Sequence, residues 1–535
     1  MMPPRYPKSV PHAFRLMLCC LLLLTPLPAT AAPPENFDAR VEQVRAAAGV
    51  PGMAIAIVEN GETTLTRGYG VRKLGEATPV DARTIFPNGS TGKAFTSAGL
   101  AILVDQGKIG WDDKVIDHMP WFRMYDPWVT REMTVRDLLV HRSGLGLGAG
   151  DLLFVPRSDL SRRETVRRLA FIKPATSFRS GYAYDNVLYT VAGQLIEEVT
   201  GQSWERWTAE QLFRPAGMQT ATSDQDKRFA TANRAFPHAR LGGALRGDGT
   251  MQRLDERDEL GRNSAPAGLA AVSAEDMARW IAIQLGKGAI PGGGRLFSEA
   301  ASEQMWTPVV IQPNRPLPAA LATTQPLFRS YALGWDVSDY RGARLVSHGG
   351  GVFGFVCTVV LIPEKNVGFT ILTNAEEGSV VRGLMYELID HYLGAPKVNW
   401  PETYAKFTGE RMAAAKTALA APAARPAKVG PSLELARYVG TYRDPWYGDI
   451  AVGQSGGKLT IDFKSTPRMA GRLEHWQYDT FVTRFDDKAL EPAYVTFALD
   501  ADGKPARVTM KAVSPIADFS WDYHDLEFRP VEAKR

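Results

Sequence analysis

The sequence is poor in cysteine and has no clustered histidine. Three cysteines occur in 535 residues, and Cys19 and Cys20 lie in an apolar N-terminal stretch. Cys357 lies in the apolar run 356–362, so we predict a buried core thiol there rather than a nucleophile. Once the N-terminal stretch is removed, a disulfide within the chain is excluded. The eight histidines are scattered without metal-ligand spacing, and the chemistry proposed below requires no metal or cofactor.

A large charge of either sign is also missing. The formal net charge is +4, and loss of Arg5, Lys8 and Arg15 with the N-terminal stretch would leave about +1 (4 − 3). A basic binding surface is therefore not indicated, and no nucleic-acid partner is expected. The 45% hydrophobic and 22% charged fractions are those of a soluble globular protein, and the length exceeds one ordinary domain.

The N-terminal apolar stretch is too short to span a bilayer. It runs from Leu16 to Leu24 and follows a basic segment without acidic residues. The tripeptide Ala29-Thr30-Ala31 comes shortly after it. This order is typical of a secretory signal peptide with a small-x-small cleavage site. We therefore predict that residues 1–31 are removed, that the protein is periplasmic or secreted, and that no stable membrane span remains.

The rest of the chain is organised around Ser90. Lys93 follows it by three residues, and residues 94–104 are mostly apolar and free of helix breakers before Gly107. This pattern predicts a helix that begins at Ser90, with Lys93 one turn later on the same face. A helix N-terminus favours developing negative charge, and a buried lysine amine can act as the base that a serine nucleophile needs. A capping serine beside a solvated lysine is the alternative.

Two loops carry further polar candidates. Tyr184 and Asn186 precede an amphipathic helix over 187–200, closed by Gly201, and their alternate spacing could point both side chains into one cleft. An aromatic turn is an equally simple explanation of this segment. His141 is a weaker candidate, because a helix end followed by a Ser-Gly turn accounts for it.

The segment His348-Gly349-Gly350-Gly351 lies between two predicted strands. Glycines beside a strand let a second backbone or a substrate approach closely. Backbone N–H groups of this segment could form one half of an oxyanion hole, with the N–H of Ser90 as the other half. A turn with an incidental histidine is the alternative.

The element pattern predicts two β-rich ends around a helical middle. Residues 51–69 read as a hairpin around Asn60-Gly61, and strands recur from 331 to 373. We predict one antiparallel sheet of five strands closed by both ends of the chain, with helices and a helical lobe beside it, within a domain over 32–400. Residues 401–432 have the Ala/Pro-rich composition of a linker. Residues 433–535 predict a small all-β domain without a catalytic constellation.

Three motifs in one order resemble the serine β-lactamase and penicillin-binding-protein superfamily. They are Ser90-x-x-Lys93, Tyr184-x-Asn186 and His348-x-Gly350. The chain is most similar to the branch with class C β-lactamases, D,D-carboxypeptidases, D-aminopeptidases and related esterases. The resemblance covers about residues 40–395 and includes similar short sequence segments at 68–70, 134–145, 266–280 and 331–335. It implies an α/β (α+β) β-lactamase-like fold.

The resemblance also implies a two-step acyl transfer. Its catalytic residues would be Ser90, Lys93 and Tyr184, with Ser90 as nucleophile and the other two moving the proton. The expected substrate-binding residues are Asn186, His348, Gly350 and Gly351. Asn186 would orient Lys93 or the substrate, and His348 would support Tyr184 or meet the substrate.

Two positions depart from the family pattern. Gly92 stands before the lysine where threonine is common, and His348 replaces the lysine that usually opens the third motif. Because histidine is mostly neutral near pH 7, the second change disfavours anionic, penicillin-like substrates. We expect an exported serine hydrolase of esterase, D-Ala-D-Ala carboxypeptidase or D-aminopeptidase type, acting on a small ester, an amide or a peptidoglycan-like peptide. A β-lactamase and a catalytically silent relative that binds cell-wall peptide are the alternatives. The sequence gives no indication of oligomeric state.

Overall fold

The computed structural model describes residues 2, 32–257, 260–420 and 429–532, and the statements below concern these residues. The predicted signal segment, apart from Met2, and residues 421–428 of the predicted linker lie outside them. In the part of the chain that is described, no helix is long and apolar enough to cross a membrane. Pro33–Arg535 forms a single unit.

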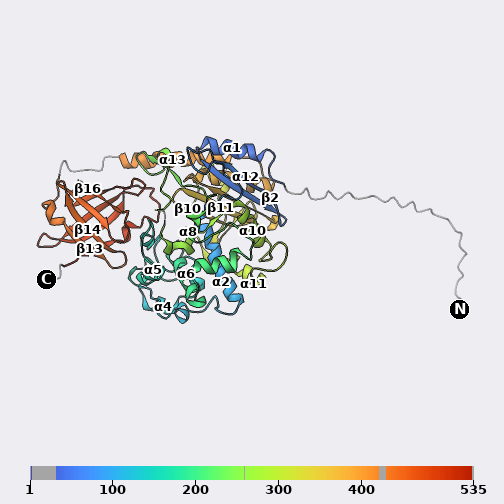
Figure 1. The fold of residues 1–535 in the computed structure, drawn as a ribbon, viewed down its shortest axis with the longest axis horizontal. Helices are drawn as coiled ribbons and strands as arrows, with labels where there is room; N and C mark the ends of the chain where they lie inside the picture. Colours follow the sequence, from blue (N-terminus) through green and yellow to red (C-terminus); the bar gives the residue numbers. More distant parts are fainter. Residues whose placement is uncertain (1, 3–31, 258–259, 421–428, 533–535) are drawn as a thin grey trace. The chain divides into compact units, whose positions relative to one another are not determined.

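An antiparallel sheet of eight strands lies at the centre of the first domain (Figure 1). In spatial order the strands are β2 (Glu62–Gly70), β1 (Gly52–Glu59), β12 (Val367–Thr373), β11 (Phe355–Ile362), β10 (Ala343–Val352), β9 (Asp336–Tyr340), β8 (Arg329–Tyr331) and β7 (Val310–Ile311). Because β1 pairs with β12, both ends of the domain close one sheet, as predicted. The predicted count of five strands was wrong. β7, β8 and β9 extend the sheet; the strand pattern that begins at residue 331 overlaps β8 and β9, but three strands this short are not separated by an alternating pattern.

The first hairpin follows the sequence pattern. Asn60 and Gly61 have φ of 52° and 84°, as a two-residue turn that matches the twist of the flanking strands requires. β1 is buried along its whole length because its two faces meet two different cores. Ala54, Ala56 and Val58 belong to the larger core, and Met53, Ile55 and Ile57 to the smaller one.

Helices cover both faces of the sheet (Figure 1). α1 (Phe37–Ala47) and α12 (Gly378–Leu393) pack in the smaller core, and α10 (Ala274–Leu285) packs in the larger. α10 begins at a capping box between Ser273 and Asp276.

The larger core also holds the two helices that carry the site, α2 (Lys93–Asp105) and α6 (Val187–Thr200). The other helices are α3 (Val115–His118), α4 (Pro127–Glu132), α5 (Arg162–Arg168), α7 (Trp204–Thr208), α8 (Gln225–Ala230), α9 (Ala265–Gly268), α11 (Glu299–Trp306) and α13 (Trp400–Ala420). Two small sheets pair β3 (Phe86–Pro87) with β6 (Ala271–Val272) and β4 (His238–Gly242) with β5 (Gly249–Arg253).

The segment predicted as a linker, 401–432, differs from that prediction in its first part. α13 continues to Ala420, since an alanine-rich stretch without interior proline has high helix propensity. Its start is held by tertiary contacts: Trp400 Nε1 donates to Asp390 at 2.7 Å, and the Tyr404 ring stacks on Tyr386. Composition alone shows neither contact.

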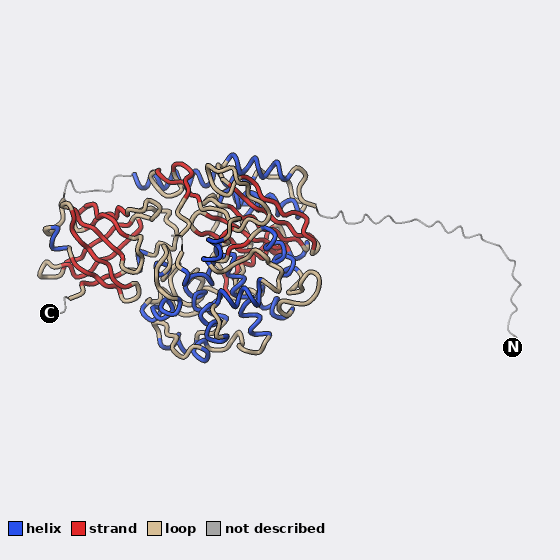
Figure 2. Tube along the Cα trace, viewed as in Figure 1, coloured by secondary structure: helices blue, strands red, loops and turns tan. Residues whose placement is uncertain are grey.

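The C-terminal domain is all-β, as predicted, and forms a closed barrel; Figure 2 shows its strands in red. The strands are β13 (Gly440–Asp444), β14 (Gly448–Ser455), β15 (Lys458–Phe463), β16 (Ala470–Gln477), β17 (Thr480–Phe485), β18 (Ala493–Leu499), β19 (Pro505–Ala512) and β20 (Glu527–Pro530). β20 closes the barrel on β13. Aromatic side chains such as Tyr438, Phe463 and Phe497 are buried in it, as expected for a small barrel packed with side chains.

Candidate active site

Ser90 lies in a short 3₁₀ turn, Gly89–Gly92, that runs directly into α2. The predicted placement of Ser90 at a helix start, with Lys93 one turn later, is therefore confirmed. Gly89 has φ of +50°, and a Cβ at this position would lie 2.6 Å from the nitrogen of Gly351. Glycine is thus required for the turn to approach β10.

Lys93 is completely buried, and its amine has three oxygen neighbours. Nζ lies 3.0 Å from Ser90 Oγ, 2.7 Å from Asn186 Oδ1 and 2.8 Å from the carbonyl of Ala267. Burial lowers the pKa of Lys93 to about 7, although the nearby carboxylate of Asp151 opposes the shift. Near neutral pH, a large fraction of the amine is therefore unprotonated and within reach of the serine hydroxyl.

The Tyr184 ring is packed between Lys93 and His141. Lys93 Nζ lies 4.8 Å from its centroid, and the His141 ring centroid lies 4.1 Å away. Burial raises the pKa of Tyr184 well above its ordinary value, and interaction with the Ser90 hydroxyl only partly offsets this. Tyr184 is therefore a neutral phenol, and among the described residues its hydroxyl has no well-aligned hydrogen-bond partner.

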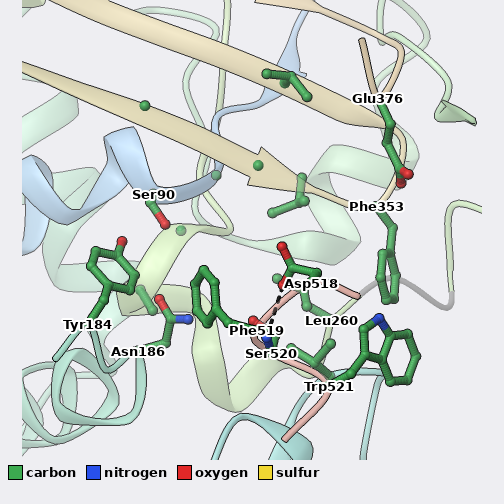
Figure 3. A pocket seen from close by; sticks show the side chains of 18 of the residues that line it. Ser90, Tyr184, Asn186, Leu260, Phe353, Glu376, Asp518, Phe519, Ser520 and Trp521 are labelled. Carbon is green, nitrogen blue, oxygen red and sulfur yellow. Dashed lines mark hydrogen bonds between the residues drawn. The ribbon is translucent and has the colours of Figure 1, made fainter. Parts of the chain in front are cut away.

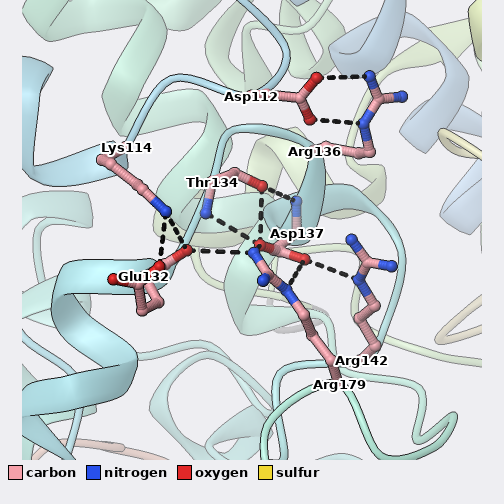
Figure 4. A network of polar contacts seen from close by, with 8 residues as sticks. All are labelled: Asp112, Lys114, Glu132, Thr134, Arg136, Asp137, Arg142 and Arg179. Atoms are coloured by element: carbon pink, nitrogen blue, oxygen red, sulfur yellow. Dashed lines mark hydrogen bonds and ion pairs between the residues drawn. The ribbon is translucent and has the colours of Figure 1, made fainter.

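A buried carboxylate fixes the loop before Tyr184 (Figure 4). Asp137 Oδ1 accepts from Arg142 Nε at 2.7 Å and from Arg179 Nε at 3.1 Å, and Oδ2 accepts from the Thr134 hydroxyl at 2.7 Å. Burial opposes ionisation, yet the hydrogen bonds from Arg179 and Thr134 hold the pKa of Asp137 below its ordinary value. The network therefore ties the segment 134–142 to Arg179, five residues before Tyr184. Arg142 belongs to this network, and the His141 ring packs on Tyr184. Both residues therefore support the structure around Tyr184.

His348 lies within β10 rather than in a turn. Its Nδ1 donates to the carbonyl of Gly349 at 2.6 Å, so its Nε2 accepts from the Tyr331 hydroxyl at 2.8 Å. Burial lowers the pKa of His348, and the ring is neutral. The His348 ring bonds to Tyr331, which sequence reasoning had not selected, and its centroid lies 6.2 Å from that of Tyr184.

The glycines after His348 bring β10 against the serine turn. A Cβ at Gly350 would lie 2.3 Å from the carbonyl oxygen of Asn88 and 2.5 Å from Cys357 Sγ. Cys357 is buried and donates to the same carbonyl at 2.7 Å, and burial raises its pKa to about 12. The predicted core thiol is thus confirmed.

The strand register sets the direction of the Gly351 N–H. In an antiparallel ladder, successive residues bond to opposite neighbours. Val352 and Phe355 are the pair that closes a two-residue hairpin, so Gly351 faces away from β11. Pairing of β10 with β9 ends at Ser347, and the Gly351 N–H therefore points beyond the end of β9, toward the turn of Ser90.

Asn186 joins Lys93 to a residue that the sequence analysis missed. Its Oδ1 accepts from Lys93, and its Nδ2 donates to Asp151 Oδ2 at 2.8 Å. Asp151 is completely buried, and burial raises its pKa to about 7. The sequence around it, Gly-Ala-Gly-Asp, resembles an ordinary turn, so only a tertiary contact reveals the residue.

A cavity of about 740 Å³ opens over Ser90, Tyr184 and Asn186. One of its walls comes from the barrel domain, in the connection between β19 and β20. Figure 3 shows Asp518, Phe519, Ser520 and Trp521 of this connection beside the catalytic candidates. The all-β domain thus contributes to the site, although no pattern in its sequence had indicated a role.

The fold and this geometry define a serine hydrolase of the β-lactamase and penicillin-binding-protein type. Residues 37–393 match the family model described as beta-lactamase, and because this is more than half of the chain, the chain belongs to that family. Residues 424–530 match a second model, described as a domain of unknown function (DUF3471).

Curated relatives and solved structures agree with this assignment. Unguisins hydrolase ungD of Aspergillus violaceofuscus is 26% identical, over 88% of this chain and 87% of its own. Penicillin-binding protein 4 of Amycolatopsis lactamdurans is 28% identical, over 69% of this chain and 91% of its own. The structure of an octameric penicillin-binding protein homologue from Pyrococcus abyssi superposes with a TM-score of 0.56 at 20% identity, over 89% of this chain and 97% of that one.

Proposed function

We propose that this protein is an exported hydrolase that cleaves an ester or amide bond through an acyl-enzyme on Ser90. The observation that carries the proposal is the buried Lys93 amine, 3.0 Å from the serine hydroxyl and with a pKa of about 7. A serine hydroxyl needs such a base to attack a carbonyl at neutral pH.

In the acylation step, Ser90 Oγ bonds to the substrate carbonyl carbon while its proton passes to neutral Lys93. The N–H groups of Ser90 and Gly351 would donate to the developing oxyanion, and the position of the Gly351 nitrogen beside the serine turn supports this role. Tyr184, a neutral phenol over the lysine, is suited to pass the proton to the leaving oxygen or nitrogen rather than to act as the first base. When the carbon–leaving-group bond breaks, the alcohol or amine departs and the acyl group stays on Ser90.

In the second step, water replaces the leaving group. Neutral Lys93 takes a proton from the attacking water, the acid is released, and that proton returns to Ser90. Asn186 holds the amine through Oδ1, which favours orientation of Lys93 over a direct role on the substrate. The protons therefore balance: the one taken from Ser90 goes to the leaving group, and the one taken from water returns to Ser90.

His348 favours a substrate without a carboxylate beside this residue, such as an ester or a D-aminoacyl amide, over a penicillin-like one. Its neutral ring has both nitrogens engaged, with Tyr331 and with Gly349, so it supplies no cation for a substrate carboxylate. The names of the two relatives, a hydrolase of unguisins and a penicillin-binding protein, are compatible with an amide or peptide substrate. Export is proposed from the signal-like residues 1–31 alone.

A substrate panel tests the proposal. Mature protein and Ser90→Ala would be compared on p-nitrophenyl esters, D-aminoacyl anilides, D-Ala-D-Ala peptides and nitrocefin, with intact-mass detection of a Ser90 adduct. Ester or D-amide turnover that Ser90→Ala lacks is the expected result. Fast nitrocefin turnover would favour the β-lactamase alternative. A folded protein without turnover or adduct would favour the silent peptide-binding relative.

A further inference from the structure

The barrel reaches the catalytic lysine through a chain of three hydrogen bonds. We propose that Ser520 of the barrel is a positioning residue, which acts on Lys93 through Asp151 and Asn186. The inference rests on the proposed acyl-enzyme function, and it assigns to the C-terminal domain a part in the chemistry.

Each bond of the chain has ordinary length. Ser520 Oγ donates to Asp151 Oδ2 at 2.7 Å, Asn186 Nδ2 donates to the same oxygen at 2.8 Å, and Lys93 Nζ donates to Asn186 Oδ1 at 2.7 Å. Asp151 is fully buried, and its other oxygen, Oδ1, has no partner among the described residues. Ser520 is therefore one of only two donors found for this carboxylate in the described chain.

The barrel loop is held against the segment that carries Asp151. The N–H of Gly150 donates to Asp522 at 2.8 Å, and a Cβ at Gly148 would lie 2.5 Å from the carbonyl oxygen of Phe519. The Phe519 ring also packs edge-on against Tyr184, with centroids 5.7 Å apart (Figure 3). These contacts flank Ser520 in sequence and fix its hydroxyl over Asp151.

The groups around Asp151 make its protonation sensitive to the Ser520 hydroxyl. Burial favours the neutral form of Asp151, whereas hydrogen bonds from Ser520 and Asn186 and the charge of Lys93 favour its ionised form. Asp518 and Asp522 of the barrel, whose own pKa values are raised by burial, act against ionisation of Asp151. Lys93 in turn faces the carboxyl groups of Asp151 and Asp185, the neutral rings of His141 and His348, and the phenols of Tyr184 and Tyr189.

Removal of the Ser520 hydroxyl should therefore lower the pKa of Lys93. Without this donor, Asp151 takes up a proton more readily, and a neutral Asp151 no longer stabilises the ammonium form of Lys93. The amine then loses its proton at lower pH. We expect the acid limb of the pH profile for kcat/KM to move to lower pH, by less than the shift of about one unit that loss of a hydrogen bond to a charged group would cause in Asp151 itself.

The experiment measures kcat/KM against pH on a small p-nitrophenyl ester for wild type, Ser520→Ala, Ser520→Thr and Ser455→Ala. Ser520→Thr keeps the hydroxyl and should restore the wild-type limb. Ser455 is exposed in the barrel, so Ser455→Ala is the matched control. If Ser520 only held the domains together, its substitution would change stability and the plateau value of kcat/KM but leave the acid limb at the wild-type pH. That result would overturn the inference.

A second measurement does not depend on catalysis. Because Ser520 stabilises ionised Asp151, the difference in melting temperature between wild type and Ser520→Ala should widen as pH rises through about 7. In an Asp151→Asn background the difference should be independent of pH. A constant difference in both backgrounds contradicts the coupling. A wild type that never acylates Ser90 overturns the proposed function and this inference together, whereas an active enzyme with an unshifted Ser520→Ala limb overturns only the latter.

Discussion

The hydrolase domain and the barrel use buried charge differently. In the hydrolase domain, Lys93, Asp151 and Asp185 are fully buried; Lys93 Nζ lies 3.0 Å from Ser90 Oγ, and both carboxyl groups act on the pKa of Lys93. The barrel interior is mainly aromatic, and two of its buried acids, Glu491 and Asp522, lie where it meets the hydrolase domain. Because burial of an ionisable group is costly, the positions of these groups are informative: they lie beside Ser90 in the hydrolase domain and at the interface in the barrel.

The largest effect is expected from Lys93→Met, which keeps an apolar side chain and removes the proposed base. We expect kcat/KM to fall by about 10³-fold or more. In the wild type, activity should rise with pH through about 7, because only the neutral amine accepts the serine proton. Stopped ester assays over pH 5–9 and the melting temperature of the variant test this. A folded Lys93→Met protein with activity within tenfold of wild type would remove Lys93 from the mechanism.

The barrel core should affect stability rather than chemistry. Phe463→Ala creates a cavity among buried aromatic rings and should cost about 3–5 kcal/mol of unfolding free energy. The exposed Val439→Ala is the control, with almost no change expected. Urea denaturation followed by tryptophan fluorescence measures both. If Phe463→Ala, assayed while still folded, also shifts the pH profile, then the barrel core does affect the chemistry and the difference between the domains is contradicted.

Asp137 tests whether buried charge outside the catalytic contacts also matters. Asp137→Asn leaves Arg142 and Arg179 without their carboxylate and should cost about 3 kcal/mol. Since the pKa of Asp137 is lowered by folding, this contribution is fully present above pH about 4 and disappears as pH falls further. Asp112→Asn, in the exposed pair with Arg136 seen in Figure 4, is the control. Equal effects from the two variants would contradict the assignment.

The smallest effect is expected at a peripheral contact between the domains. Arg168 Nη1 donates to the carbonyl of Trp446 at 3.1 Å and also to that of Tyr447. Arg168→Ala should lower stability by about 1 kcal/mol and leave kcat/KM unchanged. Hydrogen exchange of the 446–448 amides would show the loosened contact, with the exposed Arg163→Ala as comparison. A large loss of activity would show that the site depends on the whole interface and not on the Ser520 loop.

Much of this arrangement can be predicted from local patterns. The Ser90–Lys93 spacing, the Asn60-Gly61 turn and the Ser273 capping box are encoded within a few residues, so propensity and periodicity suffice. The short strands β7–β9 have a weaker signal, since only a strand pattern from residue 331 on overlaps β8 and β9. Asp151 and Ser520 meet across 369 residues of chain, and contacts of that kind are determined only by the folded arrangement of the two domains.

Cys357 makes the fold observable without any engineered label. It is the one cysteine outside residues 1–31, and its thiol is buried beneath the glycines of β10. A water-soluble thiol reagent can react with it only after β10 or β11 has opened locally. The rate of that reaction in native protein would therefore report, from an unmodified chain, how often the strand beside the nucleophile separates from its neighbours.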